Sequence, residues 1–326
     1  PVIIGESHTQ VRKVIFDEVQ QMPEIFPMIK IIADENPDDK GRFVLTGSGQ
    51  FLLSKNISES LAGRIGLITL LPMQYSEMPE TSREKILVNG GYPELVCNKN
   101  MNTLAFFNSY LQTYLQKDLR MFIDITNLSA FTQLIRLLAA RVGQHLNLSD
   151  ISKEIGITIA TLSRWVSILE ASFIIYLLKP YHNNMGKRLV KTPKVYFYDN
   201  GLLCFLTGIN TKEQLESGIL TGAVFENFVI TEMLKSIINK GVFGDLYFLR
   251  TSHGEEIDLI VDCNSSKIFI EIKSSHTYKV HFHKTLDKLA DSNTKKIVVY
   301  QGDTHQVTPD VKAWNYQELF MSNNFL

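Results

Sequence analysis

Two carboxylates and one lysine in the C-terminal third have types and spacing that suit divalent-cation chemistry. Asp258 lies in one apolar strand pattern, and Glu271 and Lys273 lie two apart at the end of the next. Residues two apart on a strand point to the same face, so Glu271 and Lys273 share a side. If the two strands form a hairpin whose turn centres on Asn264-Ser265, Asp258 falls opposite Glu271. Directly opposed side chains lie about 5 Å apart at Cβ, and two such carboxylates can share one magnesium ion.

This D…E-x-K arrangement resembles the core of the PD-(D/E)xK nucleases. The resemblance implies that Asp258 and Glu271 bind the metal, and that Lys273 positions the attacking water and balances charge at the phosphate. It also implies an acid on the preceding helix, and Glu226 lies where that acid is expected. His253, Glu255 and Glu256 lie just before the strand of Asp258 and could add to the site. Gln301 follows a later strand, in a position that such folds sometimes use. An ordinary surface charge cluster is the alternative, but the spacing, the hairpin symmetry and the helix acid together favour the nuclease-like site.

A second pair of acids follows a short buried strand pattern near the start of the chain. Asp17 and Glu18 come directly after Val14-Ile15-Phe16, which forms a Walker B pattern. In that pattern the first acid holds the magnesium shell, and the second polarises the water that attacks the γ-phosphate. A strand that simply ends at solvated acids is the alternative, and the short pattern alone favours it.

Further motifs follow these acids in a fixed order: Leu45-Thr46-Gly47-Ser48, Ser60-Leu61-Ala62-Gly63-Arg64, Gly90-Gly91-Tyr92-Pro93-Glu94, Tyr114-Leu115-Gln116-Lys117-Asp118, and a stretch from Lys194 to Leu202. The ordered set resembles the prokaryotic AAA-type (AAA+) ATPase family that carries a C-terminal domain of unknown function. The resemblance implies ATP and Mg²⁺ as cofactors of the intact protein, with Asp17 and Glu18 at the catalytic centre. It makes Thr46 or Ser48 a sensor of the γ-phosphate. Arg64 becomes a candidate arginine finger, acting in a homo-oligomer or within its own chain.

The phosphate-cradling loop of such ATPases is missing from the sequence. No G-x-x-x-x-G-K-[ST] pattern occurs, and in the family it would lie upstream of Pro1. We therefore expect an N-terminally truncated chain. Without the backbone amides and the lysine of that loop, this chain alone is expected to bind ATP weakly or not at all.

The middle of the chain contains a helix-turn-helix pattern. Leu148 to Gly156 resembles its first helix and turn, with Ser149 as the N-cap. The helix from Ile159 to Ala171, capped by Thr158, would be the recognition helix. Polar groups that could contact nucleic acid lie on this helix and in a basic loop after it: Thr161, Ser163, Arg164, Lys187, Arg188, Lys191 and Lys194. A packing module between protein domains is the alternative, because the same helix is rich in apolar residues.

These elements predict an α/β multidomain protein. Strand, helix and strand alternate near the N-terminus, which favours a parallel sheet. We expect the end of a P-loop NTPase α/β domain at residues 1–80, a helical and winged-helix region at 81–210, and a PD-(D/E)xK (restriction-endonuclease-like) α/β domain at 211–326.

Composition limits the partners and the compartment. The formal net charge is −1, so contact with nucleic acid must come from a local basic patch rather than from a global field. Three cysteines far apart in sequence give neither zinc-ligand spacing nor a disulfide framework. The sequence has no signal peptide pattern and no apolar run that could span a bilayer. A cytoplasmic protein without membrane contact is expected.

Three functions remain open from the sequence. In the first, nucleotide turnover in the intact protein controls a C-terminal nuclease-like domain that acts on nucleic acid. In the second, the protein is a non-catalytic switch or scaffold that binds nucleic acid or a protein. In the third, it acts through a protein partner in a defence or toxin–antitoxin-like system.

Overall fold

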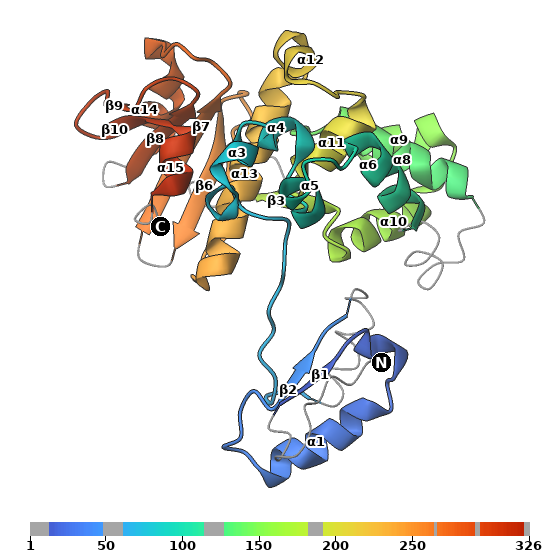
Figure 1. Cartoon of the computed structure of the whole chain (residues 1–326). Coiled ribbons are helices and arrows are strands. Elements are labelled where there is room, and N and C mark those ends of the chain that lie inside the picture. The colour runs from blue at the N-terminus through green and yellow to red at the C-terminus, as the bar shows by residue number, and fades with distance from the viewer. Residues whose placement is uncertain are drawn as a thin grey trace. The chain divides into compact units, whose positions relative to one another are not determined.

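The computed structural model describes residues 13–47, 61–113, 127–181, 192–263, 266–290 and 294–322. The chain divides into two compact units, Pro1–Leu70 and Leu71–Leu326 (Figure 1). No helix in these ranges is long and apolar enough to cross a membrane.

The first unit is a small α/β layer built on two parallel strands. Its elements are β1 (Val14–Phe16), the 3-10 helix η1 (Val19–Gln21), α1 (Ile25–Glu35) and β2 (Phe43–Leu45). Phe16 pairs with Leu45 at the carboxyl ends of the strands. Phe26 and Ile29 of α1 are buried in the core that packs against the strands. The strand–helix–strand alternation and the parallel pairing are as the sequence predicts.

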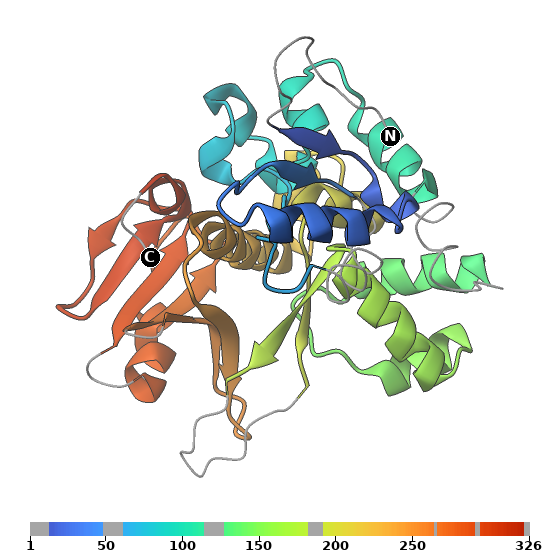
Figure 2. The same ribbon diagram turned by 90° about the horizontal axis from the view of Figure 1, so that it is seen from below.

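The second unit begins with a helical region. Its elements are η2 (Tyr75–Glu77), α3 (Glu80–Arg83), α4 (Ile86–Asn89), α5 (Pro93–Cys97), α6 (Thr103–Thr113), α8 (Leu128–Ala140), α9 (Leu148–Ile155) and α10 (Ile159–Ala171). Figures 1 and 2 both show α8, α9 and α10 grouped at the end of this unit that lies away from the red C-terminal strands.

The caps of α9 and α10 differ in how well the sequence predicted them. Thr158 caps α10 as expected, since its hydroxyl accepts a hydrogen bond from the amide of Thr161 at 3.2 Å. Ser149 as the cap of α9 is wrong. The side chain of Asn147 accepts from the amides of Ser149 and Asp150 instead, so the cap lies two residues earlier and α9 begins at Leu148. Asn is as good an N-cap as Ser, and the pattern of polar residues alone left the choice open.

A mixed sheet forms the rest of the second unit. In the described ranges, eight strands follow the order β4-β3-β5-β6-β7-β8-β10-β9. The strands are β3 (Ile175–Pro180), β4 (Lys194–Phe197), β5 (Asp245–Arg250), β6 (Glu256–Cys263), β7 (Ser266–Lys273), β8 (Lys295–Tyr300), β9 (His305–Gln306) and β10 (Val311–Asn315). The helices between and after them are α11 (Asn200–Thr207), α12 (Lys212–Ser217), α13 (Thr221–Lys240), η4 (Val280–His283), α14 (Lys284–Leu289) and α15 (Tyr316–Met321).

The hairpin β3–β4, which follows the helix-turn-helix, belongs to this same sheet. β3 pairs antiparallel with β4 and parallel with β5, where Lys179 lies beside Tyr247. Helix α13 packs against both β4 and β7, and Figure 1 shows it between the orange strands and the yellow and green helices. The strand that follows the helix-turn-helix and the strands that carry the predicted acids are thus held by one sheet and one helix.

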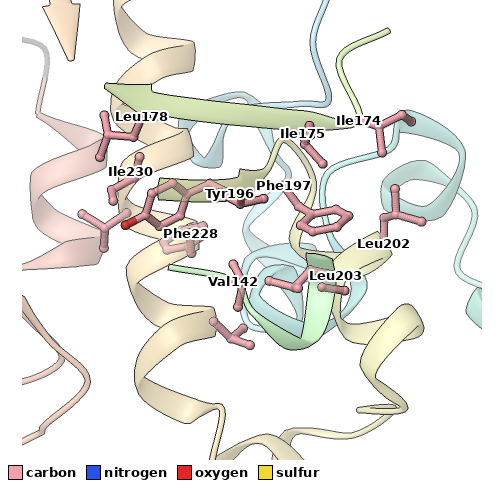
Figure 3. Packing of buried hydrophobic residues seen from close by; sticks show 14 of the residues in the cluster. Val142, Ile174, Ile175, Leu178, Tyr196, Phe197, Leu202, Leu203, Phe228 and Ile230 are labelled. Carbon is pink, nitrogen blue, oxygen red and sulfur yellow. The ribbon is translucent and has the colours of Figure 1, made fainter. Parts of the chain in front are cut away.

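One continuous hydrophobic core runs from the helical region into the sheet. Figure 3 shows a part of it, in which side chains from four elements meet: Ile175 of β3, Tyr196 and Phe197 of β4, Leu203 of α11 and Phe228 of α13 are all nearly or fully buried. The ring of Tyr196 lies in this core, while its hydroxyl makes a polar contact described below.

Two motifs that carried the family resemblance interlock at close range. The buried carboxylate of Asp199 accepts hydrogen bonds from the amides of Gly91 at 2.7 Å and Leu202 at 2.9 Å. A Cβ placed on Gly201 would lie 2.2 Å from the carbonyl oxygen of Asn89. The glycines therefore let the segment before α5 approach the start of α11, which is a packing role.

Candidate carboxylate–lysine site

The hairpin β6–β7 determines which acids face one another. Its register pairs Leu259 with Ile270 and Cys263 with Ser266. One further step in that register places Asp258 opposite Glu271, as the sequence predicts. The predicted turn residues, Asn264-Ser265, lie outside the described residues.

Lys273 draws the two carboxylates together. Its Nζ lies 2.5 Å from Oε1 of Glu271 and 3.6 Å from Oδ2 of Asp258. The same Oδ2 accepts a hydrogen bond from the backbone amide of Ile272 at 2.8 Å. Burial lowers the pKa of Lys273, but the charges of Asp258 and Glu271 outweigh it and raise this pKa above its ordinary value. The amine therefore stays protonated between the two acids.

Glu271 carries a polar atom that nothing in the described protein satisfies. The residue is 7% exposed, and its Oε2 is buried without a hydrogen-bond partner there. Burial, followed by the nearby charge of Asp258, raises the pKa of Glu271 to about 8. A buried carboxylate oxygen without a partner is costly, so this atom marks a place where a cation or a proton would be held.

Glu226 on α13 is held by strand β4. Its Oε1 accepts a hydrogen bond from the hydroxyl of Tyr196 at 2.5 Å and lies 3.3 Å from Nζ of Lys194. Lys194 also forms an ion pair with Glu256. Burial raises the pKa of Glu226, and the charge of Lys194 opposes that rise. The third predicted acid is therefore close to the others but already has a positive partner.

Glu256, at the start of β6, is saturated by cations. One of its oxygens faces Lys194, and its Oε2 accepts from Arg250 at 2.9 Å. Arg250 also contacts Nε2 of His145 at 3.4 Å. Burial lowers the pKa of this histidine. Both oxygens of Glu256 therefore contact cations, Lys194 and Arg250. In Glu271, by contrast, Oε2 has no hydrogen-bond partner among the described residues.

Two of the three predicted metal ligands, Asp258 and Glu271, lie side by side, whereas the third, Glu226, is paired with Lys194. Among the described residues, no group of three or more His, Cys, Asp or Glu side chains is arranged so that it could hold a metal ion. Asp258 and Glu271 converge on Lys273, while Glu226 lies on Lys194. The unpartnered oxygen of Glu271 fits a cation, and carboxylate oxygens are the donors that Mg²⁺ prefers.

The other residues suggested near this site have separate partners. Glu255 pairs with Lys288 of α14. The side chain of Gln301 donates to the carbonyl of Ser274 at 2.8 Å and so supports the backbone just after Lys273. His253 lies in the turn before β6.

The prediction that Lys194 belongs to an exposed phosphate-contacting loop is wrong. The residue is 4% exposed and lies in β4, inside the carboxylate cluster. The sequence showed it as the last of several basic residues, and nothing local indicated that its strand joins the sheet. Tyr196, two residues later and therefore on the same face, also donates to Glu226, a long-range contact that the sequence does not show.

In the first unit, two predicted groups meet at the carboxyl ends of the parallel strands. The hydroxyl of Thr46 donates to Oδ1 of Asp17. Ligands of α/β sheets bind outside such strand ends. Glu18 adopts φ 51°, a left-handed conformation uncommon in non-glycine residues, and accepts from Gln20.

Arg64 does not join these groups in the first unit. Its guanidinium forms a two-point contact with Asp34 at the end of α1, with Nη2 at 3.2 Å from Oδ2. A hydrogen bond from Arg64 lowers the pKa of Asp34. Ser48 lies outside the described residues.

The helix-turn-helix presents only part of its predicted surface. Ser163 and Arg164 are exposed on α10. The hydroxyl of Thr161 lies 2.9 Å from that of Thr158 and contributes to the cap. Lys187, Arg188 and Lys191 lie outside the described residues.

Comparisons with known proteins divide the chain into three stretches. Residues 2–79 match an AAA domain, residues 80–213 match a domain of unknown function (DUF8612), and residues 221–319 match another (DUF4143). No solved structure matches the chain significantly.

Three uncharacterized proteins resemble the chain over most of its length. Those of Mycobacterium bovis and Mycobacterium tuberculosis are each 28% identical over 292 residues, which covers 89% of this chain and 65% of the relative. That of Haemophilus influenzae is 25% identical over 274 residues, covering 78% of this chain and 64% of the relative. The chain thus spans about 65% of the length of these relatives. The AAA domain match and the C-terminal match to a domain of unknown function support an AAA-type ATPase family for this chain.

Proposed function

We propose that the chain is part of an AAA-type ATPase whose C-terminal region cleaves phosphodiester bonds in nucleic acid with the help of Mg²⁺. The observation that carries this proposal is the shared amine of Lys273. It lies between Asp258 and Glu271, and the second oxygen of Glu271 is buried without a partner. A lysine beside two converging carboxylates supplies both the ligands for a divalent cation and a positive group for a phosphate.

Each residue has a distinct part in this proposal. Asp258 and Glu271 would hold the ion through their carboxylate oxygens, and Glu226 would complete the set. The bound ion supplies Lewis-acid stabilisation of charge on the phosphate. Lys273 orients a water molecule for attack and balances the negative charge that develops on the phosphate. The buried setting strengthens these interactions, because charges interact more strongly away from bulk water.

The N-terminal unit would contribute the nucleotide-dependent control. Asp17 and Thr46 meet at the strand ends, where the magnesium shell and the γ-phosphate sensor of an AAA-type domain are expected. Glu18 would polarise the attacking water. Arg64 would act as a finger after leaving Asp34, either within its own chain or in a neighbouring copy.

The decisive experiment is metal-dependent nicking of supercoiled plasmid by the purified chain. The wild type is compared with Lys273→Met, and Lys212→Met serves as the control because Lys212 forms only an exposed pair with Glu216. Nicking that needs Mg²⁺ or Mn²⁺ and disappears only in Lys273→Met supports the proposal. Equal nicking by both variants would remove Lys273 from the reaction.

A non-catalytic role is the second candidate, and one observation favours it. The described side chains offer no group of three metal ligands, and amines already pair with Glu226 and Glu271. In that case the protein would be an ATPase switch or scaffold that binds nucleic acid or a protein partner, as in a defence system. Binding of DNA without cleavage, or co-purification of a protein partner free of nucleic acid, would select this role.

A further inference from the structure

Lys194 is placed as a built-in counter-cation of the acidic cluster. Its ammonium contacts Glu226 of α13 and Glu256 of β6 together, so one amine spans two elements. The side chain is 5% exposed. Burial lowers the pKa of Lys194, but the charges of Glu226, Glu256 and Asp258 raise it well above the ordinary value. A permanently charged amine is therefore fixed beside the acids proposed to bind a metal.

The two carboxylates on Lys194 are not equivalent. Glu256 has a second cation, since Arg250 holds its other oxygen at 2.9 Å. Among the described residues, the further partner of Glu226 is the neutral hydroxyl of Tyr196. Glu226 is thus paired with one cation and Glu256 with two. A divalent cation that entered the cluster would displace Lys194 from Glu226 more easily than it would bind Glu256.

We propose that Lys194 competes with the divalent cation for Glu226. The inference rests on the proposed metal-dependent function and deepens it. In the metal-free protein the amine holds Glu226 apart from Asp258 and Glu271, and full coordination requires Glu226 to exchange the amine for the metal ion. This exchange accounts for the absence of a three-ligand group among the described side chains. The acids are nevertheless close, because the charge of Asp258 raises the pKa of both Glu226 and Glu271.

Simple electrostatics sets the direction of the effect. A fixed positive charge a few ångströms from a metal ion opposes binding of that ion, and the effect is larger at a buried site than in water. Removal of the amine leaves Glu226 as a mostly buried carboxylate without its cation, which is unfavourable until another cation replaces it. Both effects favour the metal ion when Lys194 is absent.

The test measures binding of Mn²⁺ alone, without substrate or nucleotide, by calorimetry and by electron paramagnetic resonance of the whole chain. Lys194→Met removes the charge and retains an apolar side chain of similar length. Lys194→Arg retains the charge, and Lys212→Met is the matched surface control. We expect Lys194→Met to bind Mn²⁺ about tenfold more tightly or better, with the wild type, Lys194→Arg and Lys212→Met close to one another. The gain should disappear in the double variant Lys194→Met/Glu226→Gln.

Each outcome bears on a different claim. If the wild type binds Mn²⁺ and Lys194→Met binds no more tightly, the competition is refuted while the metal site stands. If neither the wild type nor the variants bind Mn²⁺, the metal-dependent function fails and the competition with it. Circular dichroism checks the fold of each variant. Lys194→Gln, which can still donate to Glu226, replaces Lys194→Met should that variant not fold, and the same gain in affinity is required of it.

Discussion

The carboxylate of Asp258 on β6 accepts a hydrogen bond from the backbone amide of Ile272 on β7. That amide lies between Glu271 and Lys273 in the chain, so the bond fixes Asp258 beside both. Asp258 therefore has two roles that substitutions can separate, one as a hydrogen-bond acceptor and one as a negative charge.

The variant Asp258→Asn should fold like the wild type but lose metal-dependent nicking. The asparagine amide can still accept from Ile272 but carries no charge for a metal ion. We expect metal-dependent nicking to fall by about 100-fold or more, with urea unfolding close to the wild type. Asp258→Ala should also lose about 1–3 kcal/mol of stability, because the amide of Ile272 is left without its acceptor. Undiminished nicking by Asp258→Asn would contradict the proposed metal site.

Stability should depend on pH through Glu271. Burial raises the pKa of this acid in the folded protein to about 8, from an ordinary value of 4.5, so between these values the folded state binds a proton that the unfolded state releases. The stability that this proton confers is complete below about pH 4.5 and is lost as the pH rises to about 8. The slope is at most about 1.4 kcal/mol per pH unit.

The matched variant for this pH effect is Glu271→Gln, which stays uncharged at every pH. Urea unfolding of both proteins from pH 5 to pH 8 should give a wild-type stability that falls relative to the variant. Parallel pH profiles would show that Glu271 titrates near its ordinary value.

ATP binding by this chain should be weak. The sequence has no P-loop pattern, so the backbone amides that hold the phosphates are not supplied, although Asp17 and Thr46 are in place. We expect a dissociation constant weaker than about 1 mM in a titration with a fluorescent ATP analogue and Mg²⁺. Tight binding that depends on Mg²⁺ would show that other residues cradle the phosphates.

Gly201 and Gly222 form a matched pair for testing close packing. Both are helical, but a Cβ on Gly201 would lie 2.2 Å from the backbone oxygen of Asn89, whereas one on Gly222 would meet only Ser274 Oγ, at 3.8 Å. Gly201→Ala should therefore cost about 1–3 kcal/mol. Gly222→Ala should be neutral or stabilise by up to about 1 kcal/mol. Thermal and urea unfolding check both, and equal stability of the two variants would refute the interlock.

Duplex binding by the helix-turn-helix should depend on Arg164. This residue is exposed on α10, the helix that the sequence predicts to be the recognition helix. If α10 enters a groove, Arg164→Ala should weaken binding of duplex DNA about tenfold, whereas Arg136→Ala, at an exposed position of α8, should change it little. Fluorescence anisotropy at fixed salt measures both. Equal affinities would indicate that α9 and α10 are a packing module.

Local patterns predicted much of the fold and half of the carboxylate site. Alternation and apolar runs located β6 and β7, and a symmetric turn was enough to place Asp258 opposite Glu271, because a hairpin register depends only on neighbouring residues. Similarly, the parallel ends of β1 and β2 brought Asp17 and Thr46 together.

The rest depended on contacts between distant parts of the chain. The parallel pairing of β3 with β5 joins residues almost 70 apart, as in Lys179 with Tyr247, and no local pattern specifies it. β4 pairs with β3 and packs against α13. Lys194, which looks like a loop residue in the sequence, therefore contacts Glu226. The sequence also did not show which of two polar residues, Asn147 or Ser149, caps α9, because both types are good N-caps.

The pairing of β3 with β5 also governs how the protein can be dissected. β3 pairs with β5 at Lys179–Tyr247 and Pro180–Phe248, so a fragment beginning after the hairpin would leave the edge of β5 unpaired at these positions. Such an exposed edge recruits strands from other molecules. The excised C-terminal third would therefore aggregate, and it would also lack the amine that neutralises Glu226 and Glu256. The acids and the helices before them belong to one compact unit, Leu71–Leu326, so a functional fragment needs both.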